Sequence, residues 1–511
     1  MFHTSSGPSQ HLTYFTGDDV AMVPETQAQS APVQNKYSVN DIVAEGVALV
    51  ASLRSNSSLP SKVVPEIVSS FNQITECTVD YLREQVLGPL KEEPAVSTQT
   101  FNKIEQSLEY VRKPLEFLSS KYKQDEYFTS HPLFVSAETL PVGFRYDVRN
   151  MQNKLVYDTY EYISIEKNLR SLLQNKDYVD LLVNCKSDYE SEPVIREFSD
   201  GERYHNHFLF GDGDKFSIQI QLFFDGMGTT NPLRGQSSTC NVGVFYYTIL
   251  NLPHIHNSCF ANVHLLALCN MLDIKVHGYR PVLERFVAEI NHLQRVGFSG
   301  TFPVIGSKQV YVGLAQVSCD NLALNGLFGF IECFSADFFC TICLATQSDI
   351  QSKTRESEYC IRTRASYEAD VANTMSITAG HSHGVKMPCL LNDIDGFHVT
   401  ENFVIDPMHT LLEGVVPCEL YCILSQLVNV KCYFSIADLN SRMHSFFDRN
   451  SVDKGNRPPT ISPLQTSSSV LSPSMKAVQM WSLLRYLPVF MGNLVPGDDP
   501  HWIFLLHLCE L

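Results

Sequence analysis

The sequence predicts an α/β fold built on a mixed β-sheet, with a helical region before the sheet and a largely helical extension after it. Residues Lys215 to Gly226 (KFSIQIQLFFDG) alternate apolar and mostly polar side chains, which is the period of a strand buried on one face. Two further runs of strand length follow, and then a helix, a fourth strand and a second helix. Asp225 closes the first of these strands, and Asp320 closes the fourth.

The composition is that of a globular protein of a reducing compartment. The 511 residues suffice for roughly two to four domains, and acidic residues outnumber Lys and Arg by 55 to 38. The formal charge of −17 repels a nucleic-acid backbone unless basic residues cluster locally, and the sequence has no such cluster. The 15 cysteines lack the spacing of a disulfide framework, and the sequence contains neither a secretory signal nor a run of about eighteen uninterrupted apolar residues. We therefore expect an intracellular protein with no membrane span.

Three regions precede the predicted sheet. Residues 1–36 are rich in Ser, Thr, Gln and Pro, and we expect a disordered tail there. Apolar residues recur every three or four positions over 37–123, which predicts three amphipathic core helices, the third of them kinked or divided at Pro114. The mixed pattern of 124–214 predicts a connection that wraps the next domain, with one helix around Ser164–Leu182.

The core predicted over 215–335 has a specific order of elements. Its strands are Lys215–Gly226, Val242–Leu250 (VGVFYYTIL), Asn262–Cys269 (NVHLLALC) and Lys308–Cys319 (KQVYVGLAQVSC), with a helix over Pro281–Val296 that Gly297 ends and helical spacing after Asp320. This is the order of a ribonuclease-H-like domain, in which the first three strands form an antiparallel meander and the fourth pairs beside the first.

That topology brings Asp225 and Asp320 together although they are far apart in the sequence. Two adjacent carboxylates repel each other unless a cation lies between them, and a pair of Mg²⁺ ions is what such a site would hold. The alternative is that Asp225 only ends its strand and begins the following turn (GMGTTNP).

The extension over 336–511 carries Cys and His residues with ligand-like spacing. Cys340 and Cys343 (FFCTICLA) form a half-site for zinc or are two small buried apolar residues. His381 and His383 (GHSHG) could also bind zinc, although a glycine-bounded loop commonly leaves histidines solvated. In ENFVIDPMHTLLEG, Asp406 is positioned to cap a helix that starts at Pro407 and carries His409 in its first turn and Glu413 one turn later. We expect Cys340, Cys343 and His409 to converge.

Four of these stretches, in this order, resemble the transposase domain of CACTA (En/Spm)-type DNA transposons, in its divergent animal branch. They are FFDGMGTTNPL with VGVFYYTILNLP, VSCDNLALNGLFGF, FFCTICLA and VIDPMHTLLEGVVP, and the resemblance covers roughly residues 100–511. It implies a DDE nuclease core with Asp225 and Asp320 as the first two catalytic acids and as ligands of Mg²⁺ or Mn²⁺. It also implies that Asp406 and His409 form the Asp-x2-His signature, that Cys340 and Cys343 match a paired-cysteine motif, that the partner is DNA at transposon ends, and that the protein is nuclear.

The third acid of this resemblance has no clear counterpart. Related chains continue past an apolar segment like HWIFLLHLCEL to an Arg-Phe-Glu-type motif, whereas this sequence stops at Leu511, so we expect a truncated transposase that does not cleave DNA. Glu413 and Glu510 are the substitutes within the chain, and either would make a self-contained nuclease. The other alternative is a non-catalytic nuclear interaction or regulatory protein that keeps the fold. Zinc occupancy and oligomeric state stay open.

Overall fold

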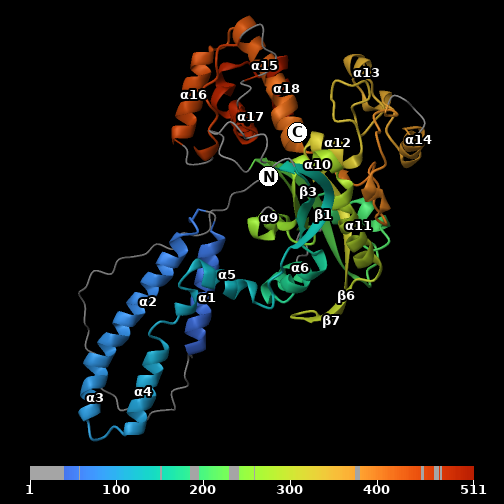
Figure 1. Cartoon of the computed structure of the whole chain (residues 1–511). Helices are drawn as coiled ribbons and strands as arrows, with labels where there is room; N and C mark the ends of the chain where they lie inside the picture. The colour runs from blue at the N-terminus through green and yellow to red at the C-terminus, as the bar shows by residue number, and fades with distance from the viewer. Residues whose placement is uncertain are drawn as a thin grey trace. The chain divides into compact units, whose positions relative to one another are not determined.

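The computed structural model describes residues 39–56, 58–149, 152–184, 195–228, 241–257, 259–374, 380–449, 454–464, 471 and 475–510. The tail predicted over 1–36 and most of the polar loop that follows Asp225, at 229–240, lie outside the described residues. The chain forms two compact units, Met1–Pro132 and Leu133–Leu511. Figure 1 shows the helices and strands of both.

The first unit is helical, as its apolar spacing predicts. Its elements are α1 (Val39–Ser55), α2 (Val63–Leu82), which continues through η1 (Arg83–Leu87) into α3 (Gly88–Glu92), α4 (Thr98–Tyr110), η2 (Glu116–Leu118) and α5 (Lys121–Thr129). Val50, Val64, Val68, Leu115 and Leu118 form its core. Pro114 lies between the end of α4 and the start of η2, so it divides the third predicted helix. The unit ends at Pro132 rather than at residue 123, because α5 belongs to it.

The second unit is an α/β structure with a mixed, open, eight-stranded sheet. Its strands are β1 (Glu138–Arg149), β2 (Gln152–Tyr162), β3 (Phe216–Gly228), β4 (Asn241–Ile249), β5 (His264–Asn270), β6 (Phe298–Phe302), β7 (Gly306–Cys319) and β8 (Phe403–Val404). The order is β1-β2-β5-β4-β3-β7-β6, and β8 pairs with β7. The pairs β3–β7 and β7–β8 are parallel, and the others are antiparallel. The meander of β3, β4 and β5 and the position of β7 beside β3 are therefore as the sequence predicts.

The parallel pair β3–β7 contains one irregularity. Ile220 lies opposite Leu314, whereas the next residue of β3, Gln221, lies opposite Gln316, so Ala315 is an extra residue in β7. The backbone oxygen of Ala315 accepts a hydrogen bond of 3.0 Å from the side-chain amide of Asn402, just before β8. The bulge is thus held by a partner from the neighbouring strand.

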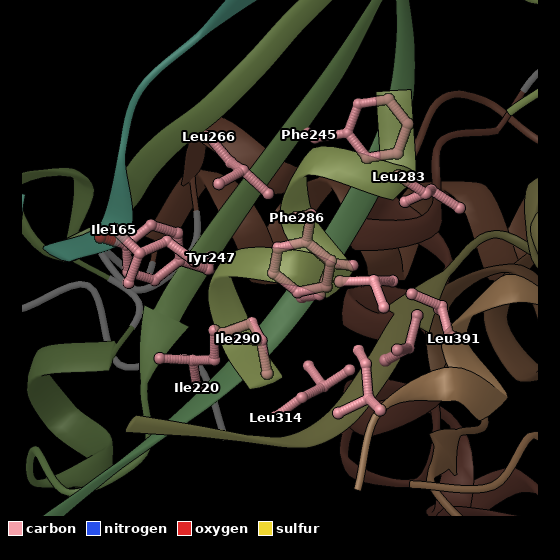
Figure 2. Packing of buried hydrophobic residues seen from close by; sticks show 14 of the residues in the cluster. Ile165, Ile220, Phe245, Tyr247, Leu266, Leu283, Phe286, Ile290, Leu314 and Leu391 are labelled. Carbon is pink, nitrogen blue, oxygen red and sulfur yellow. The ribbon is translucent and has the colours of Figure 1, made fainter. Parts of the chain in front are cut away.

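Helices α10 (Met271–His277) and α11 (Arg280–Arg295) cross over between β5 and β6, and Gly297, in the left-handed conformation (φ 67°), follows α11. Phe286 and Ile290 of α11 point into the same cluster as Ile220 of β3 and Leu314 of β7, as Figure 2 shows. These side chains are almost fully buried, so the main core lies between the sheet and α11.

The region 124–214 does more than connect. It supplies β1 and β2 to the sheet, followed by α6 (Ile165–Leu172), α7 (Lys176–Asn184), η3 (Phe198–Asp200) and α8 (Glu202–Asn206). The sequence did not predict these two strands, because large apolar side chains also lie on the exposed face of the hairpin. The polar and apolar residues therefore do not alternate as they do in a strand with one buried face. Phe144 and Tyr157 face each other across the hairpin, and both are at least 60% exposed.

The main core also extends beyond residue 335. Tyr367, Cys389, Leu391 and Phe397 are buried in the same cluster as the strands, so a core boundary at 335 is too early. The intervening elements are α9 (His254–Asn257), η5 (Phe260–Asn262), α12 (Asn321–Phe328), α13 (Gln347–Ser352), η6 (Glu356–Glu358), α14 (Arg364–Thr374) and η7 (Leu390–Asp393).

The remaining residues form helices around a core of their own. These helices are η8 (Met408–Val415), α15 (Val416–Ser425), η9 (Gln426–Val430), α16 (Ile436–Arg449), η10 (Lys454–Asn456), α17 (Ala477–Met491), η11 (Gly492–Leu494) and α18 (Pro500–Glu510). Within the described residues, the continuous helix Met408–Val430 is the one helix long and apolar enough to cross a membrane by length and composition. One such helix is weak evidence for a span, and its Leu420, Leu424 and Leu427 are buried in this core.

Candidate active site

Asp225 and Asp320 lie side by side at one edge of the sheet. The parallel pairing of β3 and β7 ends at Phe224 and Cys319, and each aspartate is the next residue of its chain segment. Neighbouring strands are about 4.8 Å apart, so the two backbones that carry the carboxylates are held close. Asp225 does not end its strand as expected, because β3 continues to Gly228 paired with β4 alone. Both aspartates line one pocket of about 740 Å³.

Asp320 also caps a helix. Its Oδ1 accepts a hydrogen bond of 2.6 Å from the backbone N–H of Ala323 in the first turn of α12. This bond positions the carboxylate and leaves Oδ2 for another ligand. Asp225 is exposed, so its carboxylate is accessible from the pocket.

A buried thiol reports on the charges at this edge. Burial, together with the smaller effect of the negative charges of Asp320, Asp225 and Asp406, raises the pKa of Cys319 to about 12. The thiol therefore stays protonated, and it does not compete with the carboxylates as a nucleophile or as a thiolate ligand.

Asp406 reaches the same edge through a strand that the sequence did not reveal. In the parallel pair β7–β8, Val404 lies opposite Ser318, so Asp406 follows β8 by the same two residues by which Asp320 follows Ser318. A strand of two residues has no readable alternation, and only its pairing with β7 identifies it. Asp225, Asp320 and Asp406 thus stand at the same end of three adjacent parallel strands.

The carboxylate of Asp406 is already engaged, largely as the sequence predicts. Its Oδ1 accepts a hydrogen bond of 2.8 Å from the N–H of Met408 at the start of η8, and Oδ2 pairs with Nδ1 of His409. Burial acts to lower the pKa of His409, but the hydrogen bond to Asp406 and the charges of Asp406, Glu413 and Asp320 together raise it above its usual value. His409 and Glu413 therefore lie within electrostatic range of the site, whereas Glu510 is exposed at the end of α18.

Cationic side chains line the same pocket. Lys275 lies in α10, Arg280 is the first residue of α11, and Lys386 comes from the loop that follows Val385. His277 and Glu332 also line it, and apolar side chains such as Leu283 and Leu322 complete the wall. Sequence reasoning missed these cations because they come from separate segments and form no basic run.

Cys340 and Cys343 lie close to each other, beside a buried arginine. The Cys340 and Cys343 thiols are within hydrogen-bonding distance of each other, and burial raises the pKa of Cys343. The neighbouring Arg362, whose side chain is only 1% exposed, donates to the backbone oxygens of Cys340 (3.1 Å) and His383 (2.5 Å) and forms an ion pair of 3.3 Å with Asp370.

The histidines of the GHSHG loop are occupied by local contacts. Nδ1 of His383 lies 2.6 Å from Asp370, and Nδ1 of His381 accepts a long hydrogen bond of 3.4 Å from the N–H of Gly384. His409 pairs with Asp406 instead of joining Cys340 and Cys343. In the part of the chain that the structure describes, no three His, Cys, Asp or Glu side chains form a group that could hold a metal ion. Zinc binding by Cys340 and Cys343 stays a prediction.

Comparison with known proteins adds no assignment. No protein-family model matches the chain, and no curated protein matches it.

Proposed function

We propose that this chain carries a nucleic-acid-processing core of the ribonuclease-H-like class, derived from a CACTA-type DNA transposase, in which Asp225 and Asp320 hold divalent metal ions against a DNA phosphate. The observation that carries the proposal is the adjacency of these two carboxylates, which come from neighbouring parallel strands and line one pocket together with cationic side chains. The two aspartates are far apart in the sequence, so it is the pairing of β3 with β7 that brings them together.

The strand order supports the proposed class. An antiparallel meander of β3, β4 and β5 is followed by crossover helices, and β7 then pairs parallel to β3 on its free side. β8 adds a further parallel strand beside the carboxyl-terminal residues of β7. This order supports a ribonuclease-H-like domain that is extended by β1, β2 and β6.

The donor set fits Mg²⁺ or Mn²⁺. These hard cations prefer oxygen ligands, and Mg²⁺ is commonly held by one or two carboxylates, several waters and substrate phosphate oxygens. Asp225 is exposed, and Asp320 keeps Oδ2 after capping α12. When bound, such an ion lowers the pKa of a water and neutralises charge on a phosphate.

The side chains of the pocket have separate roles in this proposal. Asp225 and Asp320 supply negative charge from strands whose backbones are fixed, so little reorganisation is needed. Lys275, Arg280 and Lys386 attract the phosphate backbone, which a chain with a net charge of −17 would otherwise repel. Asp406 orients the imidazole of His409 by their ion pair, and the charge of Asp320 also acts on this imidazole.

A non-catalytic DNA-binding or interaction protein is the second candidate. It is favoured by the engagement of Asp406 with His409 and the helix cap, and by the lack, within the described residues, of a group of three His, Cys, Asp or Glu side chains that could hold a metal ion. Two carboxylates hold metal ions less firmly than three, so we expect metal binding without robust strand cleavage.

Metal titration and a nicking assay test both candidates. We expect isothermal titration calorimetry to show Mn²⁺ binding that Asp225→Asn and Asp320→Asn each weaken by about tenfold. Asn still caps a helix, so Asp320→Asn keeps the start of α12, and Asp349→Asn, at a residue of α13 that does not line the pocket, serves as a control. Mn²⁺ affinity that neither substitution changes would overturn the proposal.

The cleavage assay separates the two candidates. Supercoiled DNA is incubated with the purified chain and Mg²⁺ or Mn²⁺, and nicking is compared with that of Asp225→Asn. Metal binding without nicking favours the non-catalytic protein. Robust nicking that the substitution abolishes shows that a third ligand completes the site, and Asp406, Glu413 and Glu510 would be tested next.

A further inference from the structure

Glu332 and Lys386 form an ion pair on the wall of the pocket. We infer that Glu332 is an internal counter-ion, which neutralises Lys386 until a phosphate of a bound DNA strand displaces it. This inference rests on the proposed function and concerns the regulation of the same pocket. It assigns Glu332 a role in controlling strand binding.

The two side chains meet within the pocket lining. Nζ of Lys386 lies 3.0 Å from Oε2 of Glu332, and the two side chains are 33% and 44% exposed. An ion pair this exposed contributes little net stability, because water solvates both partners almost as well as they solvate each other. A competing anion can therefore replace the carboxylate without disturbing the fold.

The backbones that carry the pair are fixed relative to each other. Phe330 and Val385 form an antiparallel bridge, and the N–H of Ile331 donates to the oxygen of Gly384 at 2.8 Å. The N–H of Lys386 donates to the oxygen of Gly329 at 2.8 Å, where α12 ends. Exchange of Glu332 for a phosphate thus requires only rotation of side chains.

Glu332 also contacts the helix that Asp320 begins. A methyl group built on Gly326 of α12 would lie 2.5 Å from Oε1 of Glu332 and 3.2 Å from the hydroxyl oxygen of Tyr279. Burial raises the pKa of the Tyr279 hydroxyl, and the charge of Glu332 raises it further. The half-exposed Glu332 carboxylate therefore lies close to Gly326 at the wall of the pocket, and a side chain at position 326 would displace it.

The chemistry of exchange follows from these contacts. A phosphodiester carries one negative charge on two free oxygens, and a lysine ammonium has three N–H donors. When a phosphate replaces the Glu332 carboxylate, the ammonium of Lys386 stays paired with one negative charge. Glu332, however, loses its partner and faces the incoming strand as a free anion. DNA must therefore overcome both the loss of the ion pair and the repulsion by Glu332.

A double-mutant cycle tests this inference by the binding of a fluorescent 20-nucleotide oligothymidine in EDTA, where cleavage and metal binding play no part. We expect Glu332→Gln to tighten binding on the order of threefold, and Lys386→Ala to weaken binding and reduce the slope of log K against log salt by about one. In the Lys386→Ala background, Glu332→Gln should tighten binding clearly less, because the carboxylate then has no ion pair to break and only its repulsion of the strand is removed.

The control pair is Asp349 and Lys353, an ion pair of 2.6 Å whose residues do not line the pocket. Asp349→Asn changes the net charge by the same amount as Glu332→Gln and should leave the affinity unchanged. The inference is overturned if Glu332→Gln tightens binding equally with and without Lys386, or if Asp349→Asn tightens it as much, because net charge alone then explains the effect. It is also overturned if the protein does not bind oligothymidine. A coupled effect in a protein that neither binds Mn²⁺ nor nicks DNA would support this inference while removing the proposed nuclease core.

Discussion

Buried neutral histidines give the second unit a defined sensitivity to acid. Burial lowers the pKa of His207 and of His264 to about 4, and both residues are less than 10% exposed. Nδ1 of His207 accepts hydrogen bonds from the N–H groups of Leu209 and Phe210, which protonation would break. The unfolded chain, in which a histidine has a pKa near 6.5, therefore takes up protons before the folded one does.

This difference predicts a loss of stability between pH 6.5 and pH 4. The contribution of each ring is fully present above pH 6.5, and at pH 5 each lowers the free energy of unfolding by about 2 kcal/mol. Urea unfolding followed by circular dichroism at pH 7 and pH 5 measures the loss. His264→Gln should make the remaining loss smaller, and an unchanged pH dependence in that variant would contradict the assignment.

Arg362 predicts a second effect at the scale of a residue. Its guanidinium ties Asp370 to the backbones of Cys340 and His383, so Arg362→Ala takes the arginine from a carboxylate that is only 5% exposed and leaves two backbone oxygens without this donor, while His383 still pairs with Asp370. We expect a loss of about 3–5 kcal/mol in the free energy of unfolding. Arg457, paired with Asp448 at the surface, is the matched control, and Arg457→Ala should cost less than about 1 kcal/mol. Similar losses in the two variants would show that the burial of Arg362 has no energetic weight.

At the scale of the element, helix α12 links the carboxylate edge to the cationic wall. Asp320 caps its start, and Gly329, with φ 77°, ends it where the Lys386 loop docks. A methyl group on Gly329 would lie 2.3 Å from the backbone oxygen of Met387. The end of α12 therefore requires glycine at position 329.

Gly329→Ala should destabilise the protein more than Gly306→Ala does. Both glycines have positive φ, but a methyl group on Gly306 meets nothing within 4 Å, so that substitution adds only backbone strain of about 1 kcal/mol. Gly329→Ala adds the clash with Met387, and we expect about 1–3 kcal/mol beyond the control together with weaker oligothymidine binding. Thermal unfolding of both variants measures the difference. Equal shifts would mean that the Lys386 loop moves aside without cost.

Individual elements also show how far sequence reasoning reaches. β3, β7 and α11 were predictable because each is long enough for its period to repeat, and Asp225 and Asp320 were found from the strand order they close. β8 and the exposed hairpin of β1 and β2 carry no such repeat, because pairing rather than alternation defines them. The cations of the pocket meet only after folding, so no local pattern marks Lys275 or Lys386.

At the scale of the whole molecule, the pocket belongs to one of the two units. Every residue of the pocket lies in Leu133–Leu511, and none lies in Met1–Pro132. We therefore expect a fragment of residues 133–511 to bind Mn²⁺ and oligothymidine within about twofold of the full chain. Calorimetry and fluorescence anisotropy on both proteins measure this, and a larger loss would show that the helical unit contributes to the site.

The bulge at Ala315 makes the spacing along β7 a condition for the site. Before Ala315, the strands are aligned so that a continued register would set Asp225 opposite Cys319 and place Asp320 one position too far along. The extra residue brings the two aspartates level and keeps the apolar residues that follow it on their own face of the sheet, since a slip of one residue exchanges the faces. Descendants of this sequence can therefore vary the loops around β7 in length, but a one-codon deletion between Leu314 and Asp320 would separate the acids while leaving every acidic residue in place.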